Sequence, residues 1–148
     1  MRILLEQLNG LLSEEPDPIA TMANAAAFLF NALPGVSWAG FYLLRGEDLV
    51  VGPFCGKPAC TRIKPGRGVC GTAFSERKTI VVPDVHEFPG HIACDPDSRS
   101  EIVIPLFGKD SVPFGVLDLD STEYSRFDEM TADFLIKASE IISLRLND

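Results

Sequence analysis

The sequence is poor in basic residues and has no long apolar segment. Its 13 lysines and arginines are outnumbered by 21 aspartates and glutamates, which gives a net charge of -8 at pH 7. A nucleic-acid-binding surface requires clustered positive charge, so we expect no nucleic-acid partner. No apolar run approaches the length of a membrane span, and acidic residues stand where a signal peptide would need its cleavage site. We therefore expect a cytoplasmic protein without a membrane partner.

The chain also lacks internal repeats, low-complexity tracts and a linker. Its 148 residues, 46% of them hydrophobic, suit one domain with a buried core, so we expect a single domain over 1–148. The four cysteines are Cys55, Cys60, Cys70 and Cys94, and no two of them form a C-x-x-C pair. In a reducing compartment, so few thiols indicate catalysis, metal binding or packing rather than a framework of disulfides.

Hydrophobic periodicity predicts helices near both ends of the chain and strands between them. Helical spacing or composition covers 2–12, 18–33, 68–78 and 126–146, whereas strand-like runs cover 36–44, 48–56, 79–85 and a hairpin over 101–121. The stretch between the second strand and the short helix is expected to be a loop. This order predicts an α+β fold, with one antiparallel sheet and the N- and C-terminal helices packed on one face of it.

The segment "GHIACDPDSRSEI", residues 90–102, is unusual because it places a cysteine in a polar loop. A structural cysteine prefers an apolar strand or helix. Cys94 instead lies between His91 and Asp95, with Glu101 at the start of an expected strand. Reactive cysteines occupy polar, partly exposed surroundings. We interpret Cys94 as a reactive thiol, and the alternative is a loop cysteine without a role.

Asp118 and Asp120 are two residues apart on an expected strand, so their side chains point to the same face. Carboxylates on an apolar strand are costly if they are buried without a cation or a shared proton. One interpretation is a solvated face or a capped turn. The other is the floor of a pocket for a cationic ligand, to which Glu101 on the neighbouring strand also belongs. Crowding would then raise the pKa values of these groups, and one could act as an acid near neutral pH.

Trp38 and Tyr42 also share one face of a strand, while Phe41 and Leu43 take the opposite face. Two aromatic side chains on one face are typical of a sheet core. They could equally line a small apolar slot of a ligand pocket. The pattern leaves both alternatives open.

A metal site and a phosphate loop both receive weak support. His86 and His91 could join the cysteines around zinc, but the spacing matches no zinc motif, so we expect no metal and no cofactor. "PGRGVCGTA", residues 65–73, places glycines before a short helix, where an anion such as a substrate carboxylate could bind. If Cys70 lies near that helix start, its pKa could be lowered instead.

Three segments of the chain resemble the signature segments of one enzyme family. They are "GKPACTRIKPGRGVCGTA", "PDVHEFPGHIACDPDSRSEIVIPL" and "GVLDLDS". The family is that of the free methionine-(R)-sulfoxide reductases, which are GAF-fold enzymes that reduce the free amino acid sulfoxide. The resemblance is strong from about Trp38 onward and weak over the N-terminal helices. It implies one GAF domain over 1–148 that reduces free L-methionine (R)-S-oxide.

The resemblance also implies roles for individual residues. Cys94 matches the catalytic cysteine, Cys60 the resolving cysteine, and Cys70 a third cysteine whose role is less settled. The implied pocket residues are Trp38, Tyr42, Glu101, Asp118 and Asp120. Glu101 and Asp118 are candidates for protonating the sulfoxide oxygen, and which of them does so stays open. The turn before "GVLDLDS" is slightly longer than the family pattern.

Reduction of a sulfoxide by this chemistry needs at least two mobile thiols, and two loops of the chain each contain one, Cys60 and Cys94. A thiolate attacks the sulfur and becomes a sulfenic acid, a second thiol forms a disulfide with it, and an external dithiol reopens that disulfide. The expected partner is therefore a thioredoxin-like reductant, in the context of oxidative stress repair. The rival hypothesis is a non-catalytic GAF sensor for a small molecule or for redox state. The helical face is a candidate homodimer surface.

Overall fold

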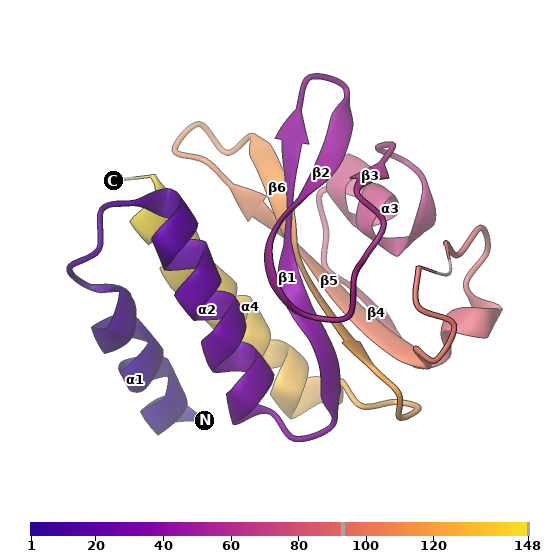
Figure 1. Ribbon diagram of the computed structural model, residues 1–148, viewed down its shortest axis with the longest axis horizontal. Helices are drawn as coiled ribbons and strands as arrows, with labels where there is room; N and C mark the ends of the chain where they lie inside the picture. The colour runs from indigo at the N-terminus through magenta and orange to yellow at the C-terminus, as the bar shows by residue number, and fades with distance from the viewer. Residues whose placement is uncertain (93, 148) are drawn as a thin grey trace.

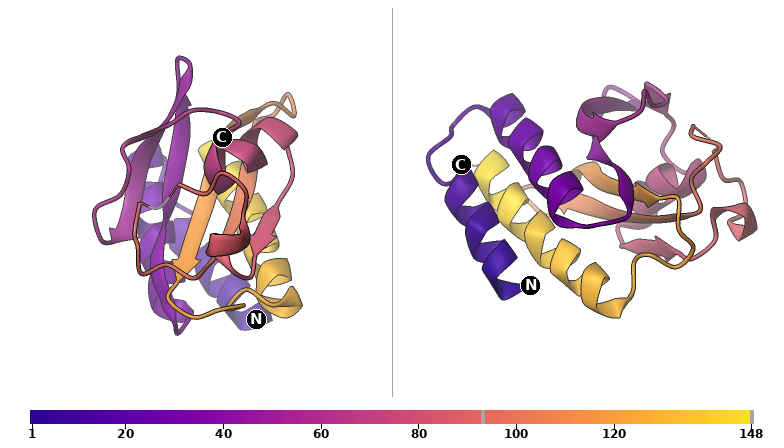
Figure 2. Two further views of the ribbon diagram at one scale, coloured as in Figure 1. Left: turned by 90° about the vertical axis from the view of Figure 1, so that its right-hand side faces the viewer. Right: turned by 60° about the horizontal axis from the view of Figure 1, so that its bottom comes forward.

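The computed structural model, which describes residues 1–92 and 94–147, contains one antiparallel sheet between two unequal layers (Figure 1). Two long helices cover one face of the sheet, a third helix packs against both of them from outside, and a short helix lies with the long loops on the other face (Figure 2). The helices are α1 (Arg2–Leu12), α2 (Pro18–Ala32), α3 (Gly68–Glu76) and α4 (Glu129–Leu146), with a 3-10 turn η1 (Val85–Glu87).

The six strands lie in the order β3-β2-β1-β6-β5-β4, and every neighbouring pair is antiparallel. The strands are β1 (Val36–Arg45), β2 (Asp48–Gly56), β3 (Arg62–Ile63), β4 (Ile80–Val82), β5 (Ser100–Phe107) and β6 (Pro113–Ser121). Strands β1 and β6, from distant parts of the sequence, lie at the centre. Hydrogen bonds on both sides hold their backbones, so side chains that project from them have rigid supports.

The helical layer supplies most of the hydrophobic core. Its two core-facing helices begin at carboxylate caps. The Asp17 carboxylate accepts from the backbone N–H of Ala20 at 3.0 Å, and the Asp128 carboxylate accepts from that of Thr131 at 2.9 Å. Each cap satisfies an N–H group that has no partner within the helix. The largest fully buried aromatic side chains in this layer are Phe41 of β1 and Phe134 of α4.

A smaller core lies on the opposite face, beneath α3 and the loops. It includes Trp38 and Tyr42 of β1 and Cys70 and Ala73 of α3. Helix α3 can pack closely on the preceding loop because Gly71 has no side chain. A Cβ atom there would lie against the Lys64 carbonyl oxygen. This face therefore carries the side chains that the sequence analysis marked as functional.

The α+β fold is confirmed, including the N- and C-terminal helices on one face of the sheet. The segment expected to be a loop before α3 contains the two-residue strand β3, which is too short to show an alternating pattern. The run 79–85 forms only the short strand β4 before η1 begins. Helix α4 starts three residues later than the expected 126, because Asp128 is its cap. None of the described helices combines the length and apolar character that crossing a membrane would require.

Gly40 of β1 provides a stability test of the smaller core. A Cβ atom at Gly40 would lie 2.8 Å from Cη2 of Trp38 and 2.9 Å from Cα of Phe54. Overpacking of this kind costs about 1–3 kcal/mol, so Gly40→Ala should lower the free energy of unfolding in urea by that amount. Gly10→Ala is the control, because that exposed position in α1 has no atom within 4 Å, and alanine there should add up to about 1 kcal/mol. Equal stability of the two variants would contradict this packing.

Candidate active site

The register of three strands brings the predicted pocket residues into two adjoining rows. Trp38 of β1 pairs with Asp120 of β6, and Asp120 pairs with Glu101 of β5. Asp118 belongs to the next row, where it is opposite Gly40. Because side chains alternate along a strand, these groups project from the face opposite the helical layer. The expectation that Asp118 and Asp120 share a face is confirmed.

These side chains line a hollow whose empty volume is about 570 Å³, with the solvent at its mouth included. The sheet forms its floor, and its walls come from the loop after β2, the first turn of α3 and the loop before β5. Of the predicted site residues, the hollow is lined by Trp38, Tyr42, Cys70, Cys94, Glu101, Asp118 and Asp120. The sequence analysis did not identify Lys57, Arg67 and Ser98, which also line it. All three lie in segments that were singled out from the sequence, but no motif marks them individually.

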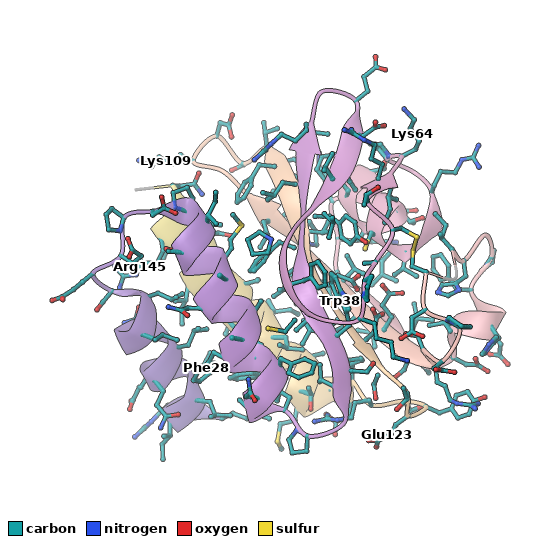
Figure 3. The ribbon with its side chains drawn as sticks, viewed as in Figure 1. Phe28, Trp38, Lys64, Lys109, Glu123 and Arg145 are labelled. Carbon is teal, nitrogen blue, oxygen red and sulfur yellow. A yellow bond between two sulfur atoms is a disulfide. The ribbon has the colours of Figure 1, made fainter. Side chains whose placement is uncertain are left out.

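Two of the four cysteines form a disulfide. Cys60, in the loop between β2 and β3, is bonded to Cys94, in the loop between η1 and β5, with their Cα atoms 5.5 Å apart. Figure 3 shows this bond in yellow on the loop side of the sheet, the side on which Trp38 is labelled. Both cysteines are half-buried. Cys70 is a buried free thiol in α3, and Cys55 is a half-buried free thiol near the end of β2. The structure therefore pairs Cys94 with Cys60 rather than with Cys70.

The carboxylates of the hollow are held in an environment that disfavours their ionised forms. Glu101 and Asp118 are 7% and 5% exposed. Asp120 keeps part of its surface open to the hollow, although protein atoms surround it densely. Loss of hydration raises the pKa of all three groups, and the negative charge of Asp118 raises the pKa of Glu101 and Asp120 further. These shifts favour protonated carboxyl groups and couple the titrations of the three members of the cluster.

The Asp118 carboxylate interacts with the side chains of Glu101 and Cys70, but one of its two oxygen atoms indicates an incomplete site. Its Oδ1 atom is buried and has no hydrogen-bond partner among the described residues. An orphaned buried acceptor is rare and costly, because it has lost its hydration without compensation. A ligand with an N–H or O–H donor would supply the missing partner. Carboxylate neighbours that repel one another would favour a cationic donor.

Burial and the same negative charges act on two further groups of the hollow. Loss of hydration, followed by repulsion from Asp118, raises the pKa of the Cys70 thiol well above its usual value. The same two causes raise the pKa of Tyr42. Cys70 is therefore a neutral thiol rather than a reactive thiolate, and the expectation that the start of α3 could lower its pKa is wrong. The Tyr42 hydroxyl remains a hydrogen-bond donor throughout the physiological range.

His91 contacts Glu101 at the edge of the cluster. Its Nε2 atom lies 3.8 Å from Oε1 of Glu101, a distance that would suit an ion pair. However, burial lowers the pKa of His91, and burial raises the pKa of Glu101. Both shifts favour the neutral forms, so we describe the contact as one between uncharged groups.

The polar atoms of the two pocket aromatics bind the loop that contains Cys60. Trp38 donates from Nε1 to the carbonyl oxygen of Lys57 at 3.0 Å, and the Tyr42 hydroxyl donates to that of Cys60 at 2.8 Å. The rings of Trp38 and Tyr42 stack with their centroids 6.0 Å apart, and Trp38 also stacks on Phe54 at 5.1 Å. The sequence analysis missed these hydrogen bonds. The available signal was that a buried tryptophan or tyrosine needs a partner for its polar atom.

The grouping of metal ligands differs from the one that was weighed from the sequence. Within the described chain, ligand atoms of Cys70, Glu101 and Asp118 lie within 4.8 Å of one another. His86 does not line the hollow and instead contacts the carboxylate of Asp84. Because burial favours the protonated forms of all three clustered groups, a cation would have to displace protons to bind there.

Known proteins share both the sequence and the fold. A family model of the GAF domain matches residues 17–147. The free methionine-R-sulfoxide reductase of Escherichia coli is 52% identical over 124 residues, which cover 84% of this chain and 74% of that protein. The free methionine-R-sulfoxide reductase of Saccharomyces cerevisiae is 40% identical over an aligned length of 151 residues, gaps included, and the alignment covers 95% of this chain and 84% of that protein.

A solved structure is similar over almost the whole chain. It is the X-ray structure of free methionine-R-sulfoxide reductase from Neisseria meningitidis in complex with its substrate. Its TM-score is 0.94 at 46% sequence identity, and the match covers 98% of this chain and 87% of that chain.

The raised pKa of Asp118 generates a prediction about stability. A carboxyl whose pKa is higher in the folded state favours folding at low pH, and this advantage is lost as the pH rises through the folded-state pKa. Asp118→Asn removes the buried charge, so it should increase the free energy of unfolding more at pH 8 than at pH 4, as measured in urea.

Asp128→Asn is the matched control. The hydrogen bond from Thr131 lowers the pKa of this exposed cap, so its contribution to stability is present above the usual carboxyl pKa. Asparagine keeps the cap but loses the charge, and stability should therefore fall at pH 8 rather than rise. If Asp118→Asn changed the free energy of unfolding equally at both pH values, the ionised Asp118 carboxylate would not destabilise the folded state.

Proposed function

The chain belongs to the GAF domain family and, within it, to the free methionine-R-sulfoxide reductases, and from this premise we propose that it reduces free L-methionine (R)-S-oxide to L-methionine. The observation that carries the proposal is the Cys60–Cys94 disulfide at a hollow floored by three carboxylates. A redox-active thiol pair and a source of protons are the two components that this reaction needs.

In the first step, Cys94 acts as the nucleophile. Its thiolate attacks the sulfoxide sulfur, the oxygen is transferred to the cysteine, and methionine leaves, so that Cys94 becomes a sulfenic acid. In the second step, the Cys60 thiol attacks this sulfenic acid and displaces water, which forms the Cys60–Cys94 disulfide. Cys70 takes no part in either step, because burial keeps it a neutral thiol inside α3.

The carboxylate cluster supplies the proton for the departing oxygen. Glu101 and Asp118 are nearly fully buried, and their raised pKa values keep proton equivalents available near neutral pH. A group is an efficient general acid when its pKa lies near the working pH. Since the three carboxylates form one interacting cluster, we assign the acid function to the cluster as a whole.

The cluster also favours the free amino acid over a residue within a peptide. The orphaned Oδ1 atom of Asp118 lacks a donor, and the ammonium of free methionine sulfoxide provides one with a positive charge. The substrate carboxylate would then bind at the start of α3. Within the helix, the first paired N–H is that of Gly71, which donates to Arg67 at 2.9 Å, so earlier N–H groups stay available for an anion. The side chains of Trp38 and Tyr42 would enclose the methyl end.

A thioredoxin-like dithiol recycles the enzyme. The half-buried Cys60–Cys94 disulfide must be opened by an external thiolate, which first forms a mixed disulfide with one of the two cysteines. The direct test is an assay of NADPH consumption with thioredoxin, thioredoxin reductase and each epimer of methionine sulfoxide. Consumption with the free R epimer supports the proposal, whereas ligand binding without turnover would indicate a GAF sensor.

Serine variants of the cysteines separate the steps. Cys94→Ser should reduce turnover to the background level and should not form a sulfenic acid. Cys60→Ser should release about one equivalent of methionine per enzyme and then stop with thioredoxin, because its sulfenic acid lacks a partner thiol. Cys55→Ser is the control and should cycle normally. Normal cycling by Cys60→Ser, together with a mapped Cys70–Cys94 bridge, would transfer the resolving function to Cys70.

Substrate analogues test the ammonium site. A charge-assisted hydrogen bond is worth about 1.5–3 kcal/mol, so loss of the ammonium should lower kcat/KM at least about tenfold. N-acetyl-methionine sulfoxide loses the charge but gains bulk. The desamino analogue, which has hydrogen in place of the ammonium, loses the charge without adding bulk. If the desamino analogue is reduced as efficiently as free methionine sulfoxide, the carboxylates serve only to protonate the oxygen.

A further inference from the structure

The loop that contains Cys60 is fixed to the central part of the sheet at three positions. It leaves β2 after Gly56 and enters β3 at Arg62. The carbonyl oxygens of residues 57 and 60 accept from Trp38 and Tyr42, as described above. The carbonyl oxygen of Thr61 accepts from the backbone N–H of Val51 at 3.0 Å. Three anchors in five residues leave the Cys60 backbone little freedom.

The two side-chain anchors are themselves rigid. Trp38 and Tyr42 project from β1, which is hydrogen-bonded to β2 on one side and β6 on the other. Their side chains are 6% and 2% exposed, and their rings stack on each other. A donor that is buried to this degree must keep its acceptor, because an unpaired polar group out of water is costly. The position of the Cys60 loop is therefore linked to that of the pocket aromatics.

The segment that contains Cys94 is held differently. In the described chain, the N–H groups of Cys94, Asp97 and Ser98 donate to oxygen atoms only two or three residues away, on Ile92 and Asp95. Among the described residues, the polar contact between this segment and the Cys60 loop is an exposed ion pair between Lys57 Nζ and Asp97 Oδ2 at 3.3 Å. Exposed pairs of this kind contribute little. Among the described residues, the backbone anchors to the sheet thus lie closer to Cys60 than to Cys94, whose segment is joined to β6 five residues later by the hydrogen bond from the Arg99 N–H to the Ser121 carbonyl oxygen at 2.8 Å.

From this asymmetry we propose that Trp38 and Tyr42 are positioning residues for disulfide closure, in addition to lining the substrate hollow. Their polar atoms hold the Cys60 thiol where the sulfenic acid of Cys94 can reach it. The step is the attack of the Cys60 thiolate on the Cys94 sulfenic sulfur, which forms the S–S bond, breaks the S–O bond and releases water. The inference rests on the proposed function for the roles of these two cysteines.

Steady-state assays cannot test this role, because the two aromatics also face the substrate. Hydrogen peroxide avoids the difficulty. It oxidises the Cys94 thiol to a sulfenic acid and is itself reduced to water, with no sulfoxide bound. The reduced protein is mixed with one equivalent of peroxide, and closure is followed as the loss of dimedone-reactive Cys94 and the appearance of the Cys60–Cys94 peptide by mass mapping.

Tyr42→Phe keeps the ring and removes the hydrogen bond to the Cys60 carbonyl. Loss of one such bond should slow closure at least about fivefold and lengthen the lifetime of the sulfenic acid by the same factor. Tyr124→Phe is the matched control. The Tyr124 hydroxyl accepts from Arg99 at 2.6 Å on the exposed surface, away from the hollow, so its removal should leave the closure rate unchanged. Trp38→Phe, which removes the second anchor, should also slow closure.

The equilibrium between the protein dithiol and oxidised glutathione provides a second measurement that needs no sulfenic acid. It reports the effective concentration of one protein thiol at the other. Tyr42→Phe should lower this value at least about fivefold, and Tyr124→Phe should not change it.

Wild-type closure and equilibrium in both Tyr42→Phe and Trp38→Phe would overturn the proposal. Failure of the proposed function can be distinguished from failure of this inference. If the wild-type protein does not reduce methionine sulfoxide, but Tyr42→Phe still forms the disulfide more slowly than the wild type, the positioning role stands and the proposed activity is wrong.

Discussion

Three carboxylates brought together on one face of a rigid sheet are the constraint on which this site depends. Strand register alone pairs Asp120 with Glu101 and places Asp118 in the adjoining row. Because they are removed from water, the three groups cannot all be ionised at neutral pH without a large cost. The same repulsion underlies the proton supply and the preference for a cationic ligand that we propose. The helical layer on the other face offsets this cost with an apolar core. One face of the sheet therefore stabilises the fold, and the other carries the carboxylates.

The thiols are divided between two environments in the same way. Cys70 is buried in α3 next to the carboxylates, where their charge and the lack of water keep it protonated. Cys94 lines the hollow, and its disulfide joins it to Cys60 in the loop after β2; both cysteines are half-buried. In the proposed reaction, the two sulfur atoms that form and break bonds therefore lie in loops, and Trp38 and Tyr42 connect the Cys60 loop to the central strand β1.

The aromatic pair connects the substrate hollow to the thiol chemistry. Both side chains line the hollow, while the polar atom of each ring binds a carbonyl oxygen of the Cys60 loop. A substitution that alters substrate binding would therefore also alter disulfide closure, and the two effects would be mixed in any steady-state rate. Pocket and loop are best regarded as one unit, supported by the central strand β1.

Local patterns in the sequence determined most of the fold. The period of two placed Asp118 and Asp120 on one face, helical spacing marked the long helices, and the polar setting of Cys94 separated it from a packing cysteine. The family resemblance implied Cys60 as the resolving cysteine, but local patterns left Cys60 and Cys70 open, and the tertiary structure bonds Cys94 to Cys60. Only the tertiary structure decided that the indole and phenol groups hold the Cys60 loop. The reason is physical: periodicity reports which way a side chain points, whereas pairing across 34 residues depends on strand order and loop path, and neither leaves a trace in the local sequence.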